Sequence, residues 1–186
     1  AEIDADLSGE LNAKFKVAQI GTLGITGEKE IQSNSLTTPD AVTLQKTFSS
    51  LHKNNFTHVV MEVSSHSLSQ NRVDNVDFDI ALFTNLTSDH LDYHKDIESY
   101  FIAKSILFEM LRPDAIAIIN DSTSFGKRII KKCKSHHITY SATNKSDITF
   151  DNLKVKMDGI NGRANISDKN YKIKSRLIGD FNSENI

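Results

Sequence analysis

Polar side chains follow three short apolar runs of the sequence, where buried strands would end. Glu62 lies within the run HVVMEV, Asn85 comes just after FDIALFT, and Asn120 directly follows AIAII. If these runs are neighbouring parallel strands, the polar groups meet at one edge of the sheet, where ligands bind. Carboxylate and imidazole groups there would suit Mg²⁺ bound beside phosphate oxygens. The alternative, that such residues only end strands and cap helices, stays open, although glutamate does little in turns.

Lys104 interrupts an otherwise apolar helix face. The segment Asp96–Leu111 has helical periodicity, and its apolar stripe consists of Ile97, Tyr100, Phe101, Leu107, Phe108 and Leu111. Lys104 falls in the middle of this stripe, three or four residues from its nearest members. Either its stem carries the ammonium group out to solvent, or a perturbed ammonium group has a function there. Periodicity alone leaves both interpretations open.

Three other kinds of site are disfavoured. His90 and His94 have a spacing that could bind zinc from a helix, but the single cysteine, Cys133, is distant in the sequence. The serines and histidine of residues 64–66 lack the G-x-S-x-G pattern of a hydrolase nucleophile. The sequence also contains no G-x-x-x-x-G-K-[ST] motif, so it has no P-loop to cradle phosphates.

Composition indicates an ordinary globular chain. Its 186 residues are 38% hydrophobic and 25% charged with a formal net charge of -2, which suits one domain with a substantial core. This near-neutral balance argues against nucleic-acid partners and anionic membranes. The single cysteine favours a reducing compartment, and no apolar run could span a bilayer. We therefore expect a cytoplasmic protein with no membrane insertion.

Strands and helices alternate over the first two thirds of the sequence. A buried strand is expected at Phe15–Gly21, followed by a loop to Ser35. A helix is then expected with Thr38 as its N-cap and Pro39 at its first position. With the three apolar runs and the helix after residue 96, this alternation predicts an α/β fold with a mostly parallel central sheet flanked by helices.

The last third has a different texture. Ile148–Met157 and Arg163–Ile173 read as short alternating segments on either side of a turn at Gly159–Gly162. This pattern predicts a β-hairpin or a small antiparallel sheet.

Two long segments carry a family resemblance. THVVMEVSSHSLSQNRVD at Thr57–Asp74 and FTNLTSDHLDYHKDIESYFIAKSILF at Phe83–Phe108 resemble the central domain of the Mur ligases, which has a P-loop-NTPase-like fold. The shorter segments IGTLG, TTPDAVTLQ, IIND and LIGDFNSENI follow the same pattern in the same order. The resemblance covers 15–186 and is closest to the members that add the third residue of the peptidoglycan stem peptide.

The resemblance implies an ATP-dependent amide ligase. Such an enzyme uses ATP and Mg²⁺ to convert the glutamate carboxylate of UDP-N-acetylmuramoyl-L-Ala-D-Glu into an acyl phosphate, which the amine of a diamino acid then attacks. Whether that amino acid is diaminopimelate or lysine is not decided by this sequence. A folylpolyglutamate synthase-like ligase is the alternative within the class, although the MEVSSH and TTPD segments argue against it.

The resemblance also implies roles for individual residues. Glu62 would ligate the Mg²⁺ that bridges the ATP phosphates, and His90 would serve a metal ion near the acyl phosphate. Lys104 corresponds to a lysine that is carbamylated in the family, which would make it both a catalytic residue and a metal ligand. Residues implied to bind substrate are Thr37, Thr38, Ser64, Gln70 and Arg72. Residues implied to bind nucleotide are Asn85, Asn120, Asn182 and Asn185.

The chain departs from the family pattern in two places. Residues 1–14 match neither the P-loop nor the helix that the family carries before Phe15, and we interpret them as a non-native or replaced leader. Leu36 stands where the family usually has asparagine. We expect the family's N-terminal UDP-binding and C-terminal amino-acid-binding domains to lie outside this sequence, and therefore expect the chain alone to be an inactive fragment. A non-catalytic binding module with the same fold is the alternative outside the ligase class.

Overall fold

The computed structural model describes residues 15–27, 36–87, 90–143 and 145–179, which form two compact units. The N-terminal unit comprises residues 1–76 and the C-terminal unit residues 77–186. The expected leader at 1–14 and the candidate residues Asn182 and Asn185 lie outside the described residues. Among the described helices, none is both long and apolar enough to cross a membrane.

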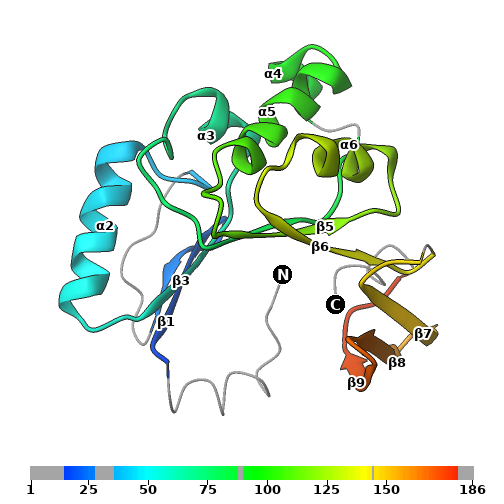
Figure 1. Cartoon of the computed structure of the whole chain (residues 1–186). Helices are drawn as coiled ribbons and strands as arrows, with labels where there is room; N and C mark the ends of the chain where they lie inside the picture. The colour runs from blue at the N-terminus through cyan, green and yellow to red at the C-terminus, as the bar shows by residue number, and fades with distance from the viewer. Residues whose placement is uncertain (1–14, 28–35, 88–89, 144, 180–186) are drawn as a thin grey trace. The chain divides into compact units, whose positions relative to one another are not determined.

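The N-terminal unit is built on a three-stranded sheet beside which α2 lies (Figure 1). Its elements are β1 (Val17–Gly21), β2 (Gly24–Thr26), α2 (Ala41–Lys53), β3 (His58–Met61) and α3 (Ser65–Ser69). The strand order is β2-β1-β3, with β3 parallel and β2 antiparallel to β1. Because Ile20 pairs with Met61, the carboxyl ends of β1 and β3 lie at the same edge. The core of this unit contains Ala18, Ile20, Ile25, Leu44, Leu51, Leu68 and Val73.

Two expectations for this unit were wrong. The N-cap of α2 is Asp40, whose Oδ1 accepts hydrogen bonds from the amides of Val42 and Thr43 at 3.1 and 3.0 Å, and Thr38 lies before the helix. Asp and Thr are both good N-caps, and the Thr38 hydroxyl is occupied by other partners. The loop expected after Gly21 contains β2, because Gly24 at φ 98° lets the chain fold back onto β1.

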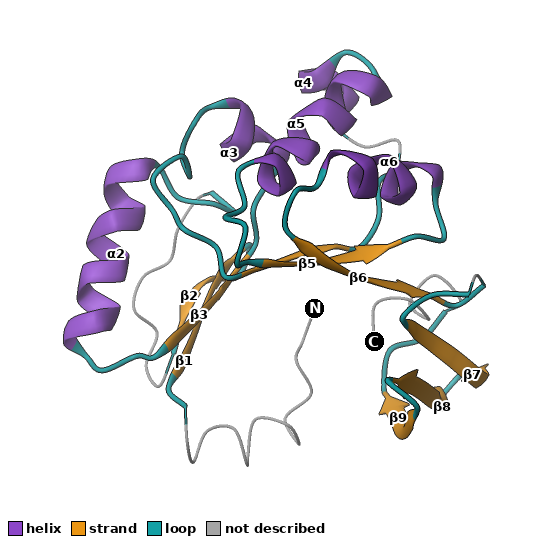
Figure 2. Cartoon of the chain, viewed as in Figure 1, coloured by secondary structure: helices purple, strands orange, loops and turns teal. Residues whose placement is uncertain are grey.

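The C-terminal unit is built on a six-stranded sheet. Its strands are β4 (Ile80–Phe83), β5 (Ile116–Asn120), β6 (His136–Ser141), β7 (Ile148–Lys156), β8 (Gly159–Ile166) and β9 (Lys169–Ser175), and its helices are α4 (Leu91–His94), α5 (Ile97–Glu109) and α6 (Ser124–Lys132). The strands lie in sequence order: β4 to β7 pair in parallel, and β7 to β9 form an antiparallel meander. Figure 2 shows α5 and α6 over the same face of β5 and β6. The α/β class and the antiparallel C-terminal part are confirmed.

The details of the meander differ from the expected hairpin. The first turn is at Met157–Asp158, and Gly159 and Gly162 both lie within β8. A Cβ at position 162 would come within 2.6 Å of Leu153 Cδ2, so this glycine serves close packing instead of a turn. A second turn at Ser167–Asp168, with φ of 47° and 65°, divides the expected second segment into two strands. Aspartate tolerates this left-handed backbone, but serine gives little sequence signal for it.

Asp147 joins the end of β6 to the start of β7. Its Oδ2 accepts hydrogen bonds from the amide and the hydroxyl of Thr139, both at 2.8 Å. The Thr139 backbone amide, followed by the hydroxyl, therefore lowers the pKa of the Asp147 carboxyl from its usual value. Because the pKa is lower in the folded state, the carboxylate stabilises the fold above its unfolded pKa, and that stability is lost as the pH falls through the folded pKa.

Replacing Asp147 with asparagine should therefore lower the free energy of unfolding at neutral pH and have a much smaller effect in acid, below about pH 3. Urea unfolding of both proteins at the two pH values measures this difference. Asp158→Asn, at an exposed turn, is the control and should change stability little at either pH. An equal loss in the Asp147→Asn variant at both pH values would contradict the ionic contribution.

Candidate active site

Glu62 directly follows β3 and is held by the segment after β1. Its Oε2 accepts hydrogen bonds from the amide and the hydroxyl of Thr22, at 2.9 and 2.8 Å. A Cβ at position 21 would lie 3.0 Å from both Cδ and Oε2 of Glu62, so Gly21 allows the carboxylate to approach the backbone of β1. These contacts fix the carboxylate at the carboxyl ends of both strands.

The surroundings of Glu62 fit a hard cation. The hydroxyl oxygens of Thr22 and Thr37 lie 3.2 Å apart, next to the carboxylate. Within the described ranges, no lysine, arginine or histidine forms an ion pair with Glu62. Oxygen donors without a competing protein cation suit Mg²⁺, which usually keeps several waters or phosphate oxygens as ligands. A cluster of three or more His, Cys, Asp or Glu side chains does not occur in the described part of the chain, so most ligands would come from outside it.

Thr38 is a buried link between the loop before α2 and the end of β3. Its hydroxyl donates a hydrogen bond to the backbone oxygen of Glu62 at 2.7 Å and accepts one from the amide of Ser64 at 3.0 Å. The residue is 0% exposed. Thr38 therefore connects the segment containing Thr37 to the backbone that carries Glu62.

Arg72, Gln70 and Ser64 complete the same network. The Arg72 guanidinium donates to the backbone oxygen of Thr38 at 2.9 Å, and its Nε donates to Gln70 Oε1 at 3.0 Å. Ser64 is the N-cap of α3. The structure thus brings together Glu62 and all five candidate substrate residues in one hydrogen-bond network, which we call the Glu62 network and which also contains Thr22. Contact of these residues with a substrate stays a prediction.

In the C-terminal unit, His90 and Lys104 meet at one aromatic ring. The ring of His90 packs edge-on against Tyr100 with centroids 5.7 Å apart, and Lys104 Nζ lies 5.6 Å from the centroid of the same ring. The ring of His94 stacks on the Tyr100 ring, with centroids 5.1 Å apart. Tyr100 and His94 are buried and Lys104 is half-buried. Tyr100 thus holds together the two residues implied to act on a metal ion, although that role stays a prediction.

The described candidate nucleotide residues make hydrogen bonds to the backbone at the strand ends. Asn120 is buried, and its side chain donates to the backbone oxygen of Thr84 at 2.9 Å and accepts from the amide of Ser122 at the same distance. It therefore ties the end of β4 to the end of β5. Asn85 is exposed, and its Oδ1 accepts from the following amide, that of Leu86, at 2.7 Å. Contact of either residue with a nucleotide stays a prediction.

Sequence reasoning missed two supporting residues. Thr22 lies inside the IGTLG segment, but its bond to Glu62 depends on the parallel register of β1 and β3, which local sequence does not reveal. Tyr100 falls in the apolar stripe, where a tyrosine at helical spacing is indistinguishable from an ordinary core residue. A hydroxyl directly after a strand-ending glycine is the only signal that could have indicated Thr22.

Comparison with known sequences identifies close relatives. Residues 8–186 match the family model of the Mur ligase middle domain. The chain is 39% identical over 177 residues to UDP-N-acetylmuramoyl-L-alanyl-D-glutamate--2,6-diaminopimelate ligase of Oceanobacillus iheyensis, covering 92% of this chain and 36% of that protein. It is 44% identical over 154 residues to the ligase of the same name from Clostridioides difficile, covering 81% and 31%. The chain therefore spans about a third of the length of these relatives.

Comparison with solved structures finds a ligase of the same name. A structure of UDP-N-acetylmuramoyl-L-alanyl-D-glutamate--2,6-diaminopimelate ligase matches with a TM-score of 0.82 at 31% identity, covering 97% of this chain and 38% of that one. The apo form of L. casei FPGS matches with a TM-score of 0.65 at 12% identity, covering 93% and 49%. At that identity, the second match shows a shared fold only.

Proposed function

This chain belongs to the Mur ligase family, and we propose that it is the ATP-binding domain of a ligase that joins a diamino acid to UDP-N-acetylmuramoyl-L-Ala-D-Glu. The observation that carries the proposal is the Glu62 network, which links a carboxylate suited to Mg²⁺ with every candidate substrate residue. The relatives that bear this activity in their names support the choice of substrate. The reaction would proceed through an acyl phosphate.

Glu62 would hold the Mg²⁺ of ATP, with Thr22 keeping its carboxylate oriented. Bound Mg²⁺ would neutralise charge on the phosphates. Thr37, Ser64, Gln70 and Arg72 would contact the nucleotide-sugar dipeptide. Thr38 would position them, because its hydroxyl already has both a donor and an acceptor within the fold.

His90 and Lys104 would act on the acyl group, oriented by the ring of Tyr100. Carbamylation of Lys104 would convert its ammonium group into an anionic ligand suited to a second metal ion. Asn85 and Asn120, with Asn182 and Asn185, would contribute to nucleotide binding. The UDP-binding and amino-acid-binding functions would come from domains outside these 186 residues, and we place the enzyme in the cytoplasm.

The test is an activity assay of the full-length protein that carries these residues. With ATP, Mg²⁺ and UDP-N-acetylmuramoyl-L-Ala-D-Glu, we expect phosphate release only when diaminopimelate or lysine is also present. Mass spectrometry should show the nucleotide-sugar tripeptide as the product. Phosphate release that does not depend on the nucleotide sugar, or that requires a folate and glutamate instead, would overturn the proposal.

Substitutions in the Glu62 network give a graded prediction in the same full-length protein. Glu62→Gln should lower kcat about a hundredfold or more and raise the Mg²⁺ concentration needed for half-maximal rate, because it removes the anionic ligand. Thr22→Val removes the hydroxyl bonds to Glu62 and Thr37 but keeps the amide bond to Glu62, and it should cost about tenfold. Thr26→Val, on the same β1–β2 hairpin but outside the network, is the matched control. Equal effects of Thr22→Val and Thr26→Val would argue against the orienting role.

A further inference from the structure

One face of the β7–β9 meander concentrates positive charge. The register of the strands puts five cations on this face, namely Lys154, Lys156, Arg163, Lys172 and Lys174. Residues 145–176 contain eight lysines and arginines and four aspartates, although the whole chain has a net charge of -2. We call this surface the basic face. Because the whole chain is close to neutral, its net charge gives no indication of the basic face.

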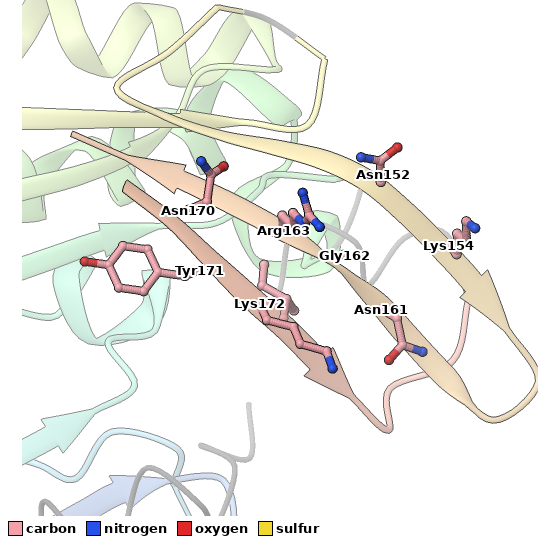
Figure 3. Close-up of a pocket in the computed structure, with 9 residues that line it drawn as sticks. Asn152, Lys154, Asn161, Gly162, Arg163, Asn170, Tyr171 and Lys172 are labelled. Carbon is pink, nitrogen blue, oxygen red and sulfur yellow. The ribbon is translucent and has the colours of Figure 1, made fainter. Parts of the chain in front are cut away.

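The basic face is hollowed, and both polar and apolar residues line the hollow (Figure 3). The hollow has a volume of about 660 Å³, and its lining includes Asn152, Lys154, Asn161, Arg163, Asn170 and Lys172. A register shift between Asp151 and Lys154 interrupts the pairing of β7 with β8, and such bulges bend a strand and increase its twist. Three carboxamide groups thus stand among three cations, which provides many hydrogen-bond donors for one anion.

The strand register opposes like charges inside the hollow. Arg163 on β8 lies directly opposite Lys172 on β9. Like charges at directly opposite positions destabilise an antiparallel sheet. On its other side Arg163 faces Asp151. The side-chain amide of Asn165 donates a hydrogen bond to Asp151 Oδ2 at 2.5 Å. In the described residues, neither Arg163 nor Lys172 forms an ion pair. Asp151 offsets part of the repulsion at Arg163, whereas Lys172 on β9 lies opposite Arg163 alone.

We propose that the basic face binds a phosphate-bearing anion, with a phosphate group between Arg163 and Lys172. The planar guanidinium group can donate two parallel hydrogen bonds to phosphate, and the lysine adds a compact charge. Asn161 and Asn170 lie next to this pair and can donate to further oxygens. Tyr171 also lines the hollow. This binding does not depend on the ligase reaction.

Titration of the 186-residue chain with pyrophosphate, followed by amide NMR shifts at about 0.1 M salt, tests the proposal. We expect saturable shifts in β8 and β9, and an apparent Kd at least about tenfold weaker in the double variant Arg163→Gln/Lys172→Gln. The matched control is Lys145→Gln/Lys169→Gln, with the same change of charge outside the basic face; Lys169 pairs with Ile166 on the other face. Equal weakening by both double variants, or shifts that do not saturate, would overturn the proposal.

Thermal unfolding provides a second measurement. Without phosphate, Arg163→Gln/Lys172→Gln should melt at the same or a higher temperature, because the opposed charges are gone. With pyrophosphate, the native chain should gain stability and this variant should not. A variant that is destabilised without ligand and still gains normally from pyrophosphate would contradict the proposal. Vesicles of phosphatidylglycerol distinguish the two kinds of molecule that could carry the phosphate group. If the vesicles compete with pyrophosphate, the ligand is a lipid headgroup. If they do not compete, the ligand is a soluble phosphate.

Discussion

Alanine at position 126 should destabilise the C-terminal unit by about 3 kcal/mol or more. Gly126 lies in the first turn of α6, and a Cβ there would come within 1.8 Å of the backbone oxygen of Asn120 and 2.9 Å of its carbonyl carbon. Both atoms belong to the main chain at the end of β5, so no side chain can turn aside to make room. The helix would have to move away from the strand that it covers.

The expected change in stability at position 126 is opposite in sign to that of an ordinary glycine-to-alanine substitution in a helix. At an unobstructed helical position, glycine to alanine stabilises a protein by about 1 kcal/mol, because alanine is the better helix former. Urea unfolding of Gly126→Ala should instead show a large loss, whereas Ser124→Ala, at an exposed position of the same helix, should change stability by about 0.5 kcal/mol or less. An alanine variant at position 126 as stable as the native chain would show that α6 does not pack on β5 as described.

A polypeptide of these 186 residues alone should release phosphate from ATP at least about a thousandfold more slowly than an intact ligase of the family. The 186 residues contain no G-x-x-x-x-G-K-[ST] motif. The backbone amides and lysine of such a loop normally hold the β- and γ-phosphates. Glu62 with one Mg²⁺ cannot by itself fix the in-line geometry of phosphoryl transfer.

The measurement is a phosphate-release assay with saturating ATP, Mg²⁺, UDP-N-acetylmuramoyl-L-Ala-D-Glu and each diamino acid. An intact Mur ligase, assayed in parallel, shows that the reagents support turnover. Retained folding of the 186-residue chain, checked by circular dichroism, separates a missing phosphate site from an unfolded protein. Turnover comparable to that of the intact enzyme would mean that residues outside the Glu62 network hold the phosphates in place of a P-loop.

The longer elements were predictable because their apolar positions repeat over several turns. The helix expected at Asp96–Leu111 is found as α5, with Asp96 as its N-cap. The start of α2 was misplaced, because Thr38 and Asp40 both suit an N-cap and only a tertiary contact separates them. The Thr38 hydroxyl is hydrogen-bonded to the backbone of Glu62 and Ser64, which are distant in the sequence. Local propensity carries no information about such a partner.

The candidate site was predictable mainly where the family resemblance named its residues. Glu62 and Lys104 also stood out on their own, one as a glutamate ending a buried run and the other as a lysine in an apolar stripe. Thr22 and Tyr100 did not, because each acts through a neighbour. Their importance depends on strand register and helix packing, which only the folded chain displays.

The junction between β6 and β7 has a consequence for how the sheet opens. These strands pair at two positions, Tyr140 with Ile148 and Ser141 with Thr149, whereas β7 with β8 and β8 with β9 pair at seven positions each. The meander is therefore joined to the parallel strands by two paired positions and by the bonds between Thr139 and Asp147, and we expect it to open as one cooperative unit. Its amide protons would exchange with solvent together, and independently of those in β4 and β5. Inserting residues between Ser141 and Ile148 would weaken the pairing of β6 with β7 without unfolding the parallel strands or the meander.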